Sequence, residues 1–180
     1  CIRFRGGEVV FCDVEEDTYL MDIKKLSRLL SQSPKGTYKG IVLVDFAGYP
    51  ANLEAFRQLA DEYGLWIIED ACHAPGGYFI DSKGEKQLCG NGNFADISVF
   101  SFHPVKHIAT GEGGMATTNS KKLYEKLCLY RTHGITKDPA LLCENHGGWY
   151  YEMQELGYNY RITDFQAALG ISQLKRADMG

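Results

Sequence analysis

Short apolar runs alternate with amphipathic stretches along most of this chain. We read five apolar runs as strands, at 8–13, 41–46, 65–69, 96–102 and 114–118. Apolar residues at helical spacing predict helices between several of these runs. Strands joined by helical crossovers form largely parallel sheets. The pattern therefore predicts an α/β fold, and 180 residues with 44% apolar content suit one domain with a sizeable core.

Capping signals indicate where the helices begin and end. Four positions carry a residue that caps a helix well: Asp22, Asn52 after Pro50, Ser120, and Thr163, which forms a capping-box pattern with Gln166. Gly64 stands where the second helix should end. Segment 76–92 is a glycine- and lysine-rich excursion between strands, and segment 136–148 has the composition of a loop.

The charge and cysteine patterns narrow the class of protein. A net charge of −4, with basic residues spread along the chain, disfavours a nucleic-acid partner. The six cysteines contain no CxxC pair and are expected to be reduced. No apolar run has the length of a membrane span and no signal pattern opens the chain, so we expect a cytoplasmic protein with no membrane partner. No metal site is expected, because Pro104 disfavours placing His103 and His107 on one helical turn.

Two charged residues, Asp70 and Lys106, end predicted strands. Open α/β sheets bind ligands beyond the carboxyl ends of their strands, so these positions are candidates for a site. The small-residue loop ACHAPGG follows Asp70, and the glycine cluster after Lys106 leads into a strand, unlike a dinucleotide fingerprint. Each residue taken singly has a structural alternative: a surface lysine in a turn, an aspartate that caps a helix or forms an ion pair, or, for His73, a half-buried core histidine.

Taken together, these residues suggest pyridoxal phosphate chemistry. The amine of Lys106 can form a Schiff base with an aldehyde, and the Asp70 carboxylate can keep a pyridinium nitrogen protonated. The His73 imidazole can stack on the ring, and the Ser101 hydroxyl can hold a phosphate oxygen.

Four motifs in order carry a resemblance to a known family: IEDACHA at 68–74, VFSFHPVK at 99–106, TGEGG at 110–114 and LGYNYR at 156–161. Together they resemble the DegT/DnrJ-type sugar aminotransferases, which are pyridoxal phosphate enzymes of fold type I. The resemblance covers nearly the whole chain. It implies that residues 1–180 are the central portion of the cofactor-binding large domain, a three-layer α/β sandwich with a mostly parallel sheet, without the leading segment and the trailing small domain.

The resemblance also implies roles for individual residues. Lys106 would be the catalytic lysine that forms the Schiff base, Asp70 would contact the pyridine nitrogen, His73 would stack on the ring and Ser101 would contact the phosphate. Asn159 matches a family asparagine that reaches the phosphate of the neighbouring subunit's cofactor. A homodimer with shared active sites is therefore implied.

Further stretches resemble the branch of the family that serves pseudaminic acid synthesis: VDFAG at 44–48, RTHGIT at 131–136 and WYYEMQ at 149–154. That branch aminates C4 of a UDP-linked 4-keto-6-deoxy-N-acetylhexosamine and converts L-glutamate to 2-oxoglutarate. Two alternatives stay open: a non-catalytic regulator or sensor that binds the same cofactor, and a 4-aminotransferase for another nucleotide sugar. Because parts of the family's site lie outside residues 1–180, we expect the isolated chain to have little or no activity.

Overall fold

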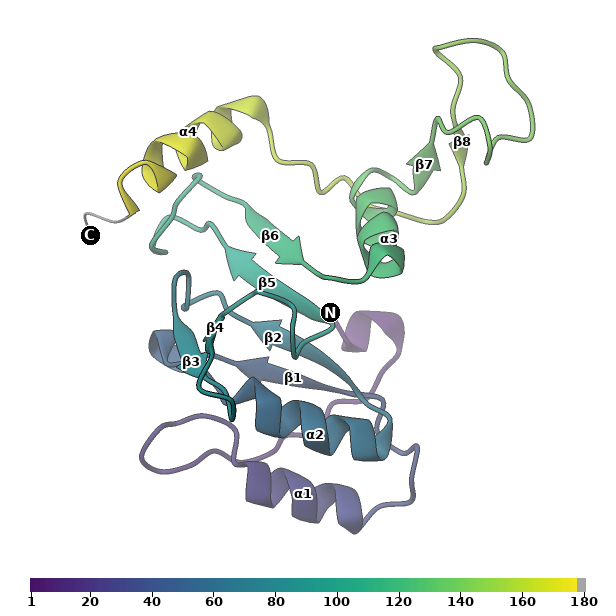
Figure 1. Cartoon of the computed structure of the whole chain (residues 1–180). Helices are drawn as coiled ribbons and strands as arrows, with labels where there is room; N and C mark the ends of the chain where they lie inside the picture. Colours follow the sequence, from purple (N-terminus) through teal and green to yellow (C-terminus); the bar gives the residue numbers. More distant parts are fainter. Residues whose placement is uncertain (178–180) are drawn as a thin grey trace.

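A four-stranded sheet forms the centre of the protein in the computed structural model, which describes residues 1–177 (Figure 1). The strand order is β1 (Gly40–Val44), β2 (Trp66–Asp70), β5 (Ile97–Ser101) and β6 (Gly114–Thr117). The first three strands run parallel, and β6 pairs antiparallel with β5. The predicted α/β class with a mostly parallel sheet is confirmed.

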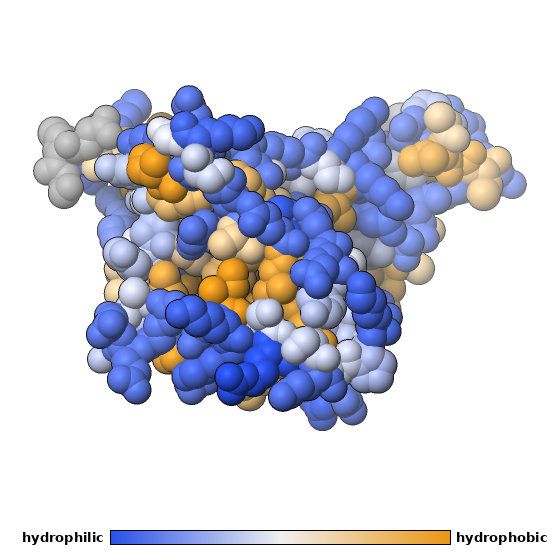
Figure 2. Space-filling model, turned by 60° about the horizontal axis from the view of Figure 1, so that its bottom comes forward, coloured by the Kyte–Doolittle hydropathy of each residue, from blue (hydrophilic) through white to orange (hydrophobic). Residues whose placement is uncertain are grey.

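Two helices, α1 (Ile23–Ser31) and α2 (Leu53–Tyr63), form a layer beside this sheet (Figure 1). Alternate strand residues point toward the layer, and they make one core with the apolar faces of the helices. Its fully buried members include Leu43, Ile67 and Ala60. On the side of the molecule drawn in Figure 2, polar residues predominate around the rim and apolar residues gather at the centre.

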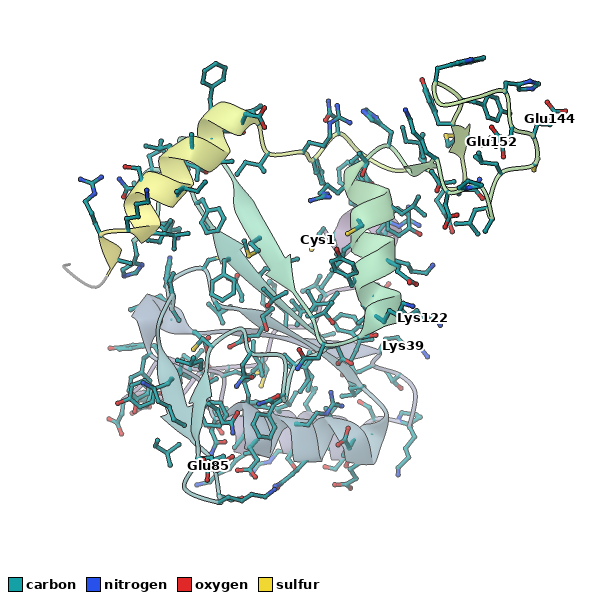
Figure 3. All side chains as sticks on the ribbon, turned by 45° about the horizontal axis from the view of Figure 1, so that its top comes forward. Cys1, Lys39, Glu85, Lys122, Glu144 and Glu152 are labelled. Atoms are coloured by element: carbon teal, nitrogen blue, oxygen red, sulfur yellow. The ribbon has the colours of Figure 1, made fainter. Side chains whose placement is uncertain are left out.

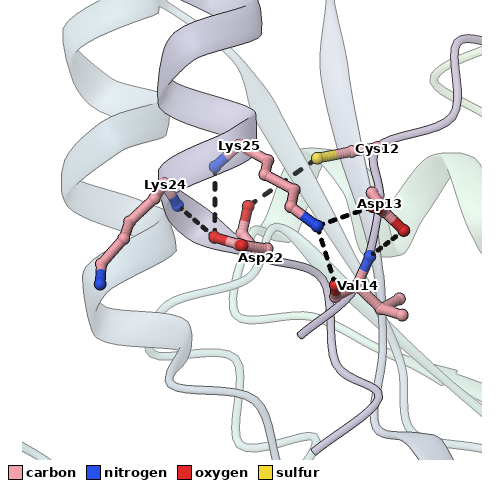
Figure 4. Close-up of polar contacts among 6 residues, drawn as sticks. All are labelled: Cys12, Asp13, Val14, Asp22, Lys24 and Lys25. Atoms are coloured by element: carbon pink, nitrogen blue, oxygen red, sulfur yellow. Dashed lines mark hydrogen bonds and ion pairs between the residues drawn. The ribbon is translucent and has the colours of Figure 1, made fainter. Parts of the chain in front are cut away.

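The predicted helix caps are confirmed by their hydrogen bonds. Asp22 Oδ1 accepts from the Lys24 and Lys25 amides at 2.8 and 3.2 Å, which fixes the start of α1 (Figure 4). Lys25 Nζ also pairs with Asp13 Oδ2 at 2.6 Å. Asn52 and Ser120 cap α2 and α3 (Lys121–Arg131), Thr163 with Gln166 forms the capping box of α4 (Asp164–Leu174), and Gly64 ends α2 in the left-handed conformation.

The strand predicted at 8–13 is wrong. This segment is extended but joins no ladder, and the only backbone pairing near it is an isolated bridge between Val14 and Met21. Val10 and Phe11 are 55% and 91% exposed, and within the described residues only Cys12 of this run packs, partly buried, against the core. A strand needs a partner edge for its amides and carbonyls, and none lies beside this segment within residues 1–177.

The excursion at 76–92 folds into a hairpin that the sequence reading did not identify. Strands β3 (Tyr78–Ile80) and β4 (Lys86–Leu88) pair antiparallel, with Tyr78 opposite Leu88. Asp81 Oδ1 organises the turn by accepting from the Lys83 and Glu85 amides at 2.9 and 2.8 Å. Figure 3 shows Glu85 near the tip of the hairpin.

The segment between α3 and α4 extends away from the sheet as an arm (Figure 1). After α3 it contains two short antiparallel strands, β7 (Ile135–Thr136) and β8 (Glu152–Met153), joined by a long loop close to the one predicted at 136–148. The Glu152 carboxylate orders this loop by accepting from the Cys143 and Glu144 amides and from the Tyr150 hydroxyl. Figure 3 shows Glu144 and Glu152 together in the arm. None of the helices in residues 1–177 combines the length and apolar character that a membrane crossing requires.

Candidate active site

The strand register brings one set of side chains to one face at the carboxyl edge of the sheet. Val44 pairs with Asp70, and Asp70 pairs with Val99. Ser101 lies two residues beyond Val99 and therefore faces the same way. These residues come from three different strands, so only strand pairing could place them together.

An open cavity of about 260 Å³ lies at this edge. Its lining consists of Val44, Asp70, Cys72, His73, Ser101 and Lys106. The cavity thus gathers four of the five residues that the sequence assigned to a site. Cys72 and Val44 were not predicted to line it, and Cys72 could have been noticed from its place between Asp70 and His73.

Asp70 is held at the end of β2 by its own backbone and by the following turn. Its carbonyl accepts from the Asp45 amide at 3.1 Å, and its Oδ1 accepts from the Cys72 amide at 3.2 Å. The turn continues with the buried residues Ala71 and Ala74. The Ala74 amide donates to the Ala71 carbonyl, and His73 lies within this turn. The aspartate and the histidine are therefore positioned by one rigid corner.

Gly48 contacts this corner from the loop after β1. It adopts a left-handed φ of +83°, and a Cβ atom at this position would lie 2.7 Å from the His73 carbonyl oxygen. Only glycine satisfies both the backbone angle and the close approach. The short helix Phe46–Gly48 and the loop carrying His73 thus fit closely together.

Lys106 lies in a loop and not at the end of a strand, which corrects the sequence reading. β5 ends at Ser101, where its pairing with Gly114 stops. Pro104 cannot donate to a ladder, so the chain turns instead. The Lys106 amide donates to the His103 carbonyl at 2.9 Å, and the His103 amide donates to Ser101 Oγ at 3.3 Å. This tight turn returns the lysine to the edge of the sheet.

The cavity changes the acidity of one of its groups. Partial burial, followed by the hydrogen bond and charge of Asp70, raises the pKa of the Cys72 thiol to about 11, and the charge of Lys106 opposes this rise only weakly. The thiol is therefore protonated at neutral pH and acts as a small, neutral wall of the cavity.

Asn159, the fifth predicted site residue, does not line this cavity. It is exposed and forms an isolated bridge with Thr132 at the end of α3. The neighbouring rings of Tyr158 and Tyr160 stack with their centroids 4.9 Å apart. The assignment of Asn159 to the cofactor of the neighbouring subunit remains a prediction.

The residues around the cavity fit pyridoxal phosphate. An amine, a carboxylate, an imidazole and a hydroxyl converge on one open space, and the 260 Å³ volume is close to the lower end of the roughly 300–1,000 Å³ found for ligand sites. Buried alanines at 71 and 74 keep the corner beside it narrow. The donor set matches the groups that would hold an aldehyde carbon, a pyridine nitrogen, an aromatic ring and a phosphate.

This fold and this set of side chains define an α/β protein of the aminotransferase class. The chain belongs to the DegT/DnrJ/EryC1/StrS aminotransferase family, whose model matches residues 1–179. The resemblance carried by the four motifs is thereby confirmed.

Individual relatives support the same placement. A UDP-4-amino-4,6-dideoxy-N-acetyl-beta-L-altrosamine transaminase of Campylobacter jejuni is 40% identical over 173 residues, which cover 96% of this chain and 42% of the relative. A GDP-perosamine synthase of Escherichia coli is 33% identical over 177 residues, covering 98% and 43%.

Solved structures give the same result at the level of the fold. PseC of Helicobacter pylori, described as an aminotransferase involved in the biosynthesis of pseudoaminic acid, matches with a TM-score of 0.77 and 33% identity over 98% of this chain and 42% of its own. The PLP form of Spr1654 of Streptococcus pneumoniae matches with a TM-score of 0.77 and 27% identity, covering 99% of this chain and 45% of its own. The chain thus spans less than half the length of the relatives it matches.

Proposed function

We propose that the full-length protein is a pyridoxal phosphate-dependent transaminase that aminates C4 of a UDP-linked 4-keto-6-deoxy-N-acetylhexosamine, with L-glutamate as donor and 2-oxoglutarate as product. The observation that carries the cofactor part is the convergence of Asp70, His73, Ser101 and Lys106 on one cavity. The substrate part is supported by similarity to the Campylobacter transaminase and to PseC. Residues 1–180 would be the central portion of the cofactor-binding domain.

Four of the six residues that line the cavity have distinct tasks in this proposal. When bound, the cofactor supplies an electron sink for the carbon that loses and regains a proton. Asp70 would accept the pyridinium N–H, His73 would cover one face of the ring and Ser101 would donate to the phosphate. Lys106 would bind the cofactor aldehyde, and its freed amine would then move the proton on the substrate carbon, because the amine stays tethered beside it.

The proposal includes a homodimer. Asn159 lies outside the cavity lined by Asp70 and Lys106 and is exposed, so it is available to a second subunit. We propose that it reaches the phosphate of the neighbouring subunit's cofactor. Exposed apolar side chains in the same arm, including Trp149 at 70% and Met153 at 68%, give this arm the composition of an interface.

A second candidate is a 4-aminotransferase for another nucleotide sugar, which the similarity to GDP-perosamine synthase favours. A panel of UDP-, GDP- and dTDP-linked 4-keto sugars, assayed with the full-length protein and L-glutamate, separates the two. Amination of the UDP-linked N-acetylhexosamine alone supports the proposal. Amination of only a GDP-linked sugar would refute the UDP assignment.

The role of Lys106 is tested by substitution and by chemical trapping. Lys106→Ala in the full-length protein should abolish glutamate-dependent loss of the cofactor's long-wavelength absorbance, whereas the matched control Lys122→Ala, an exposed lysine on α3, should not. Borohydride reduction should attach the cofactor to Lys106. If the cofactor attaches to Lys106 but does not react with glutamate, the regulator or sensor alternative is favoured. Separately, full turnover by the isolated 180 residues would refute the expectation that they are inactive.

A further inference from the structure

A pair of carboxyl groups is buried directly behind the proposed cofactor cavity. Asp45 follows β1 and is 0% exposed, and Glu69 lies in β2 and is 1% exposed. Cys89 completes the cluster, with one polar atom from each of the three residues within 4.8 Å of the others. Side chains alternate along β2, so Glu69 points to the helix-covered face while Asp70 faces the cavity.

Only one oxygen of each carboxyl group has a hydrogen-bond donor. Asp45 Oδ1 accepts from the Ala51 amide at 2.9 Å. Glu69 Oε2 accepts from the Gly90 amide at 2.9 Å and from the Ser98 hydroxyl. Asp45 Oδ2 and Glu69 Oε1 are buried without a partner. Buried polar atoms are normally satisfied, so this pair of orphaned oxygens requires an explanation.

Among the described residues, the groups that surround the pair carry no positive charge. Within residues 1–177, no lysine, arginine or histidine forms an ion pair with either group. The groups that face them are the Cys89 thiol, the Ser98 hydroxyl and the amides of Ala51 and Gly90. Burial, reinforced by the charge of Glu69, raises the pKa of Asp45 to about 7, and the Ala51 amide and, more weakly, the nearby Cys89 thiol oppose this rise.

We propose that Asp45 and Glu69 share one proton through their unpartnered oxygens, and that this pair is a positioning device for the edge of the sheet that carries Asp70. A proton between the two oxygens satisfies both at once and leaves a single buried charge. Neither residue touches the cavity, so the pair acts through the backbone.

The contacts of the pair reach all three parallel strands. The Asp45 amide donates to the Asp70 carbonyl at 3.1 Å, which joins the end of β1 to the end of β2. Glu69 is joined to Ser98 of β5, three residues before Ser101. Loss of the shared proton would place two like charges between these strand ends and push them apart. Cofactor affinity should therefore fall as the pH rises above neutrality, a consequence that rests on the proposed function.

The first experiment needs no cofactor. The infrared spectrum of the full-length apoprotein should contain a protonated-carboxyl band at neutral pH that disappears as the pH is raised. Asp45→Asn and Glu69→Gln should each remove the band, whereas Asp17→Asn, the same change at an exposed position, should leave it. Absence of the band in the wild type would overturn the proposal without relying on any variant. The proposal would also be overturned if the purified wild-type protein held one zinc ion per chain and the Cys89→Ser variant held none.

The second experiment measures the pH profile of pyridoxal phosphate affinity. In the wild type we expect the affinity for pyridoxal phosphate to fall by up to about tenfold per pH unit above neutrality, which is the slope that one linked proton gives. Asp45→Asn should lack this decline because it keeps an oxygen for the Ala51 amide but does not titrate, and Asp17→Asn should retain it. Superimposable profiles for the wild type and Asp45→Asn would overturn the positioning role. Failure of the cofactor to bind at any pH would refute the proposed function, while the infrared result still decides the shared proton.

Discussion

Replacing Asp45 by asparagine should change how the stability of this protein depends on pH. The pKa of Asp45 rises in the folded state from an ordinary 3.8 to about 7, chiefly because the group is buried. Between these two values the folded protein keeps a proton that the unfolded chain has lost. The stabilisation is therefore fully present below about pH 4 and is lost as the pH rises through about 7.

The size of this effect follows from the same two values. One pKa unit corresponds to about 1.4 kcal/mol, so the rise from 3.8 to about 7 sets an upper limit of roughly 4 kcal/mol on the stability lost across that range. Relaxation of the site and entry of water reduce this limit, and we expect a loss of stability of about 2–4 kcal/mol. The side chain in Asp45→Asn does not titrate, so this variant should lack the decline.

Urea unfolding of the full-length apoprotein between about pH 5 and pH 8 measures the difference. The other titrating groups are common to both proteins and cancel when the free energies of unfolding are subtracted. The free energy of unfolding of the variant should rise relative to that of the wild type up to about pH 7 and the difference should then level off, with an unchanged dependence on urea. A difference that stays constant across the range, as expected for Asp17→Asn, would refute the buried-proton reasoning.

Three further predictions concern the cavity itself. Gly48→Ala should destabilise the protein by about 1–3 kcal/mol and weaken cofactor binding, because the new Cβ meets the His73 carbonyl. Thermal unfolding should show a smaller loss for Gly84→Ala, which has a similar φ of +81° but open space around it, and equal losses would contradict the contact. Cys72 should react slowly with iodoacetamide at neutral pH and faster toward pH 11, as followed by peptide mass spectrometry; rapid labelling at pH 7 would show that the thiol is not buried as described. Asp70→Asn should lower cofactor affinity by at least about tenfold in an equilibrium titration, and unchanged affinity would remove Asp70 from the proposed site.

The helices and the central strands could be predicted because their signals are local. Asp22 accepts from amides only two and three residues away, so its capping role was visible in the sequence. The β3–β4 hairpin was missed because its strands are three residues long, too short for a periodic signal. The strand at 8–13 was wrong because its apolar pattern has no partner edge in the described structure.

The candidate site was predictable in part. The types of residue at 70, 73, 101 and 106 predicted a site, and all four line one cavity, while the four motifs identified the family. Cys72 was missed because its position in the lining depends on the turn after β2. Lys106 was placed on a strand because Pro104 was read as a continuation of β5 and not as its end.

By itself, the sequence determined the α/β class, the helix boundaries and the family, since each depends on residue types within a few positions of one another. The tertiary structure decided which residues meet. The parallel register placed Asp70 and Ser101 on one face, and burial of Asp45 beside Glu69 raised the pKa of the Asp45 carboxyl group far above its ordinary value. Register and burial arise from contacts between residues far apart in the chain, and no local pattern records them.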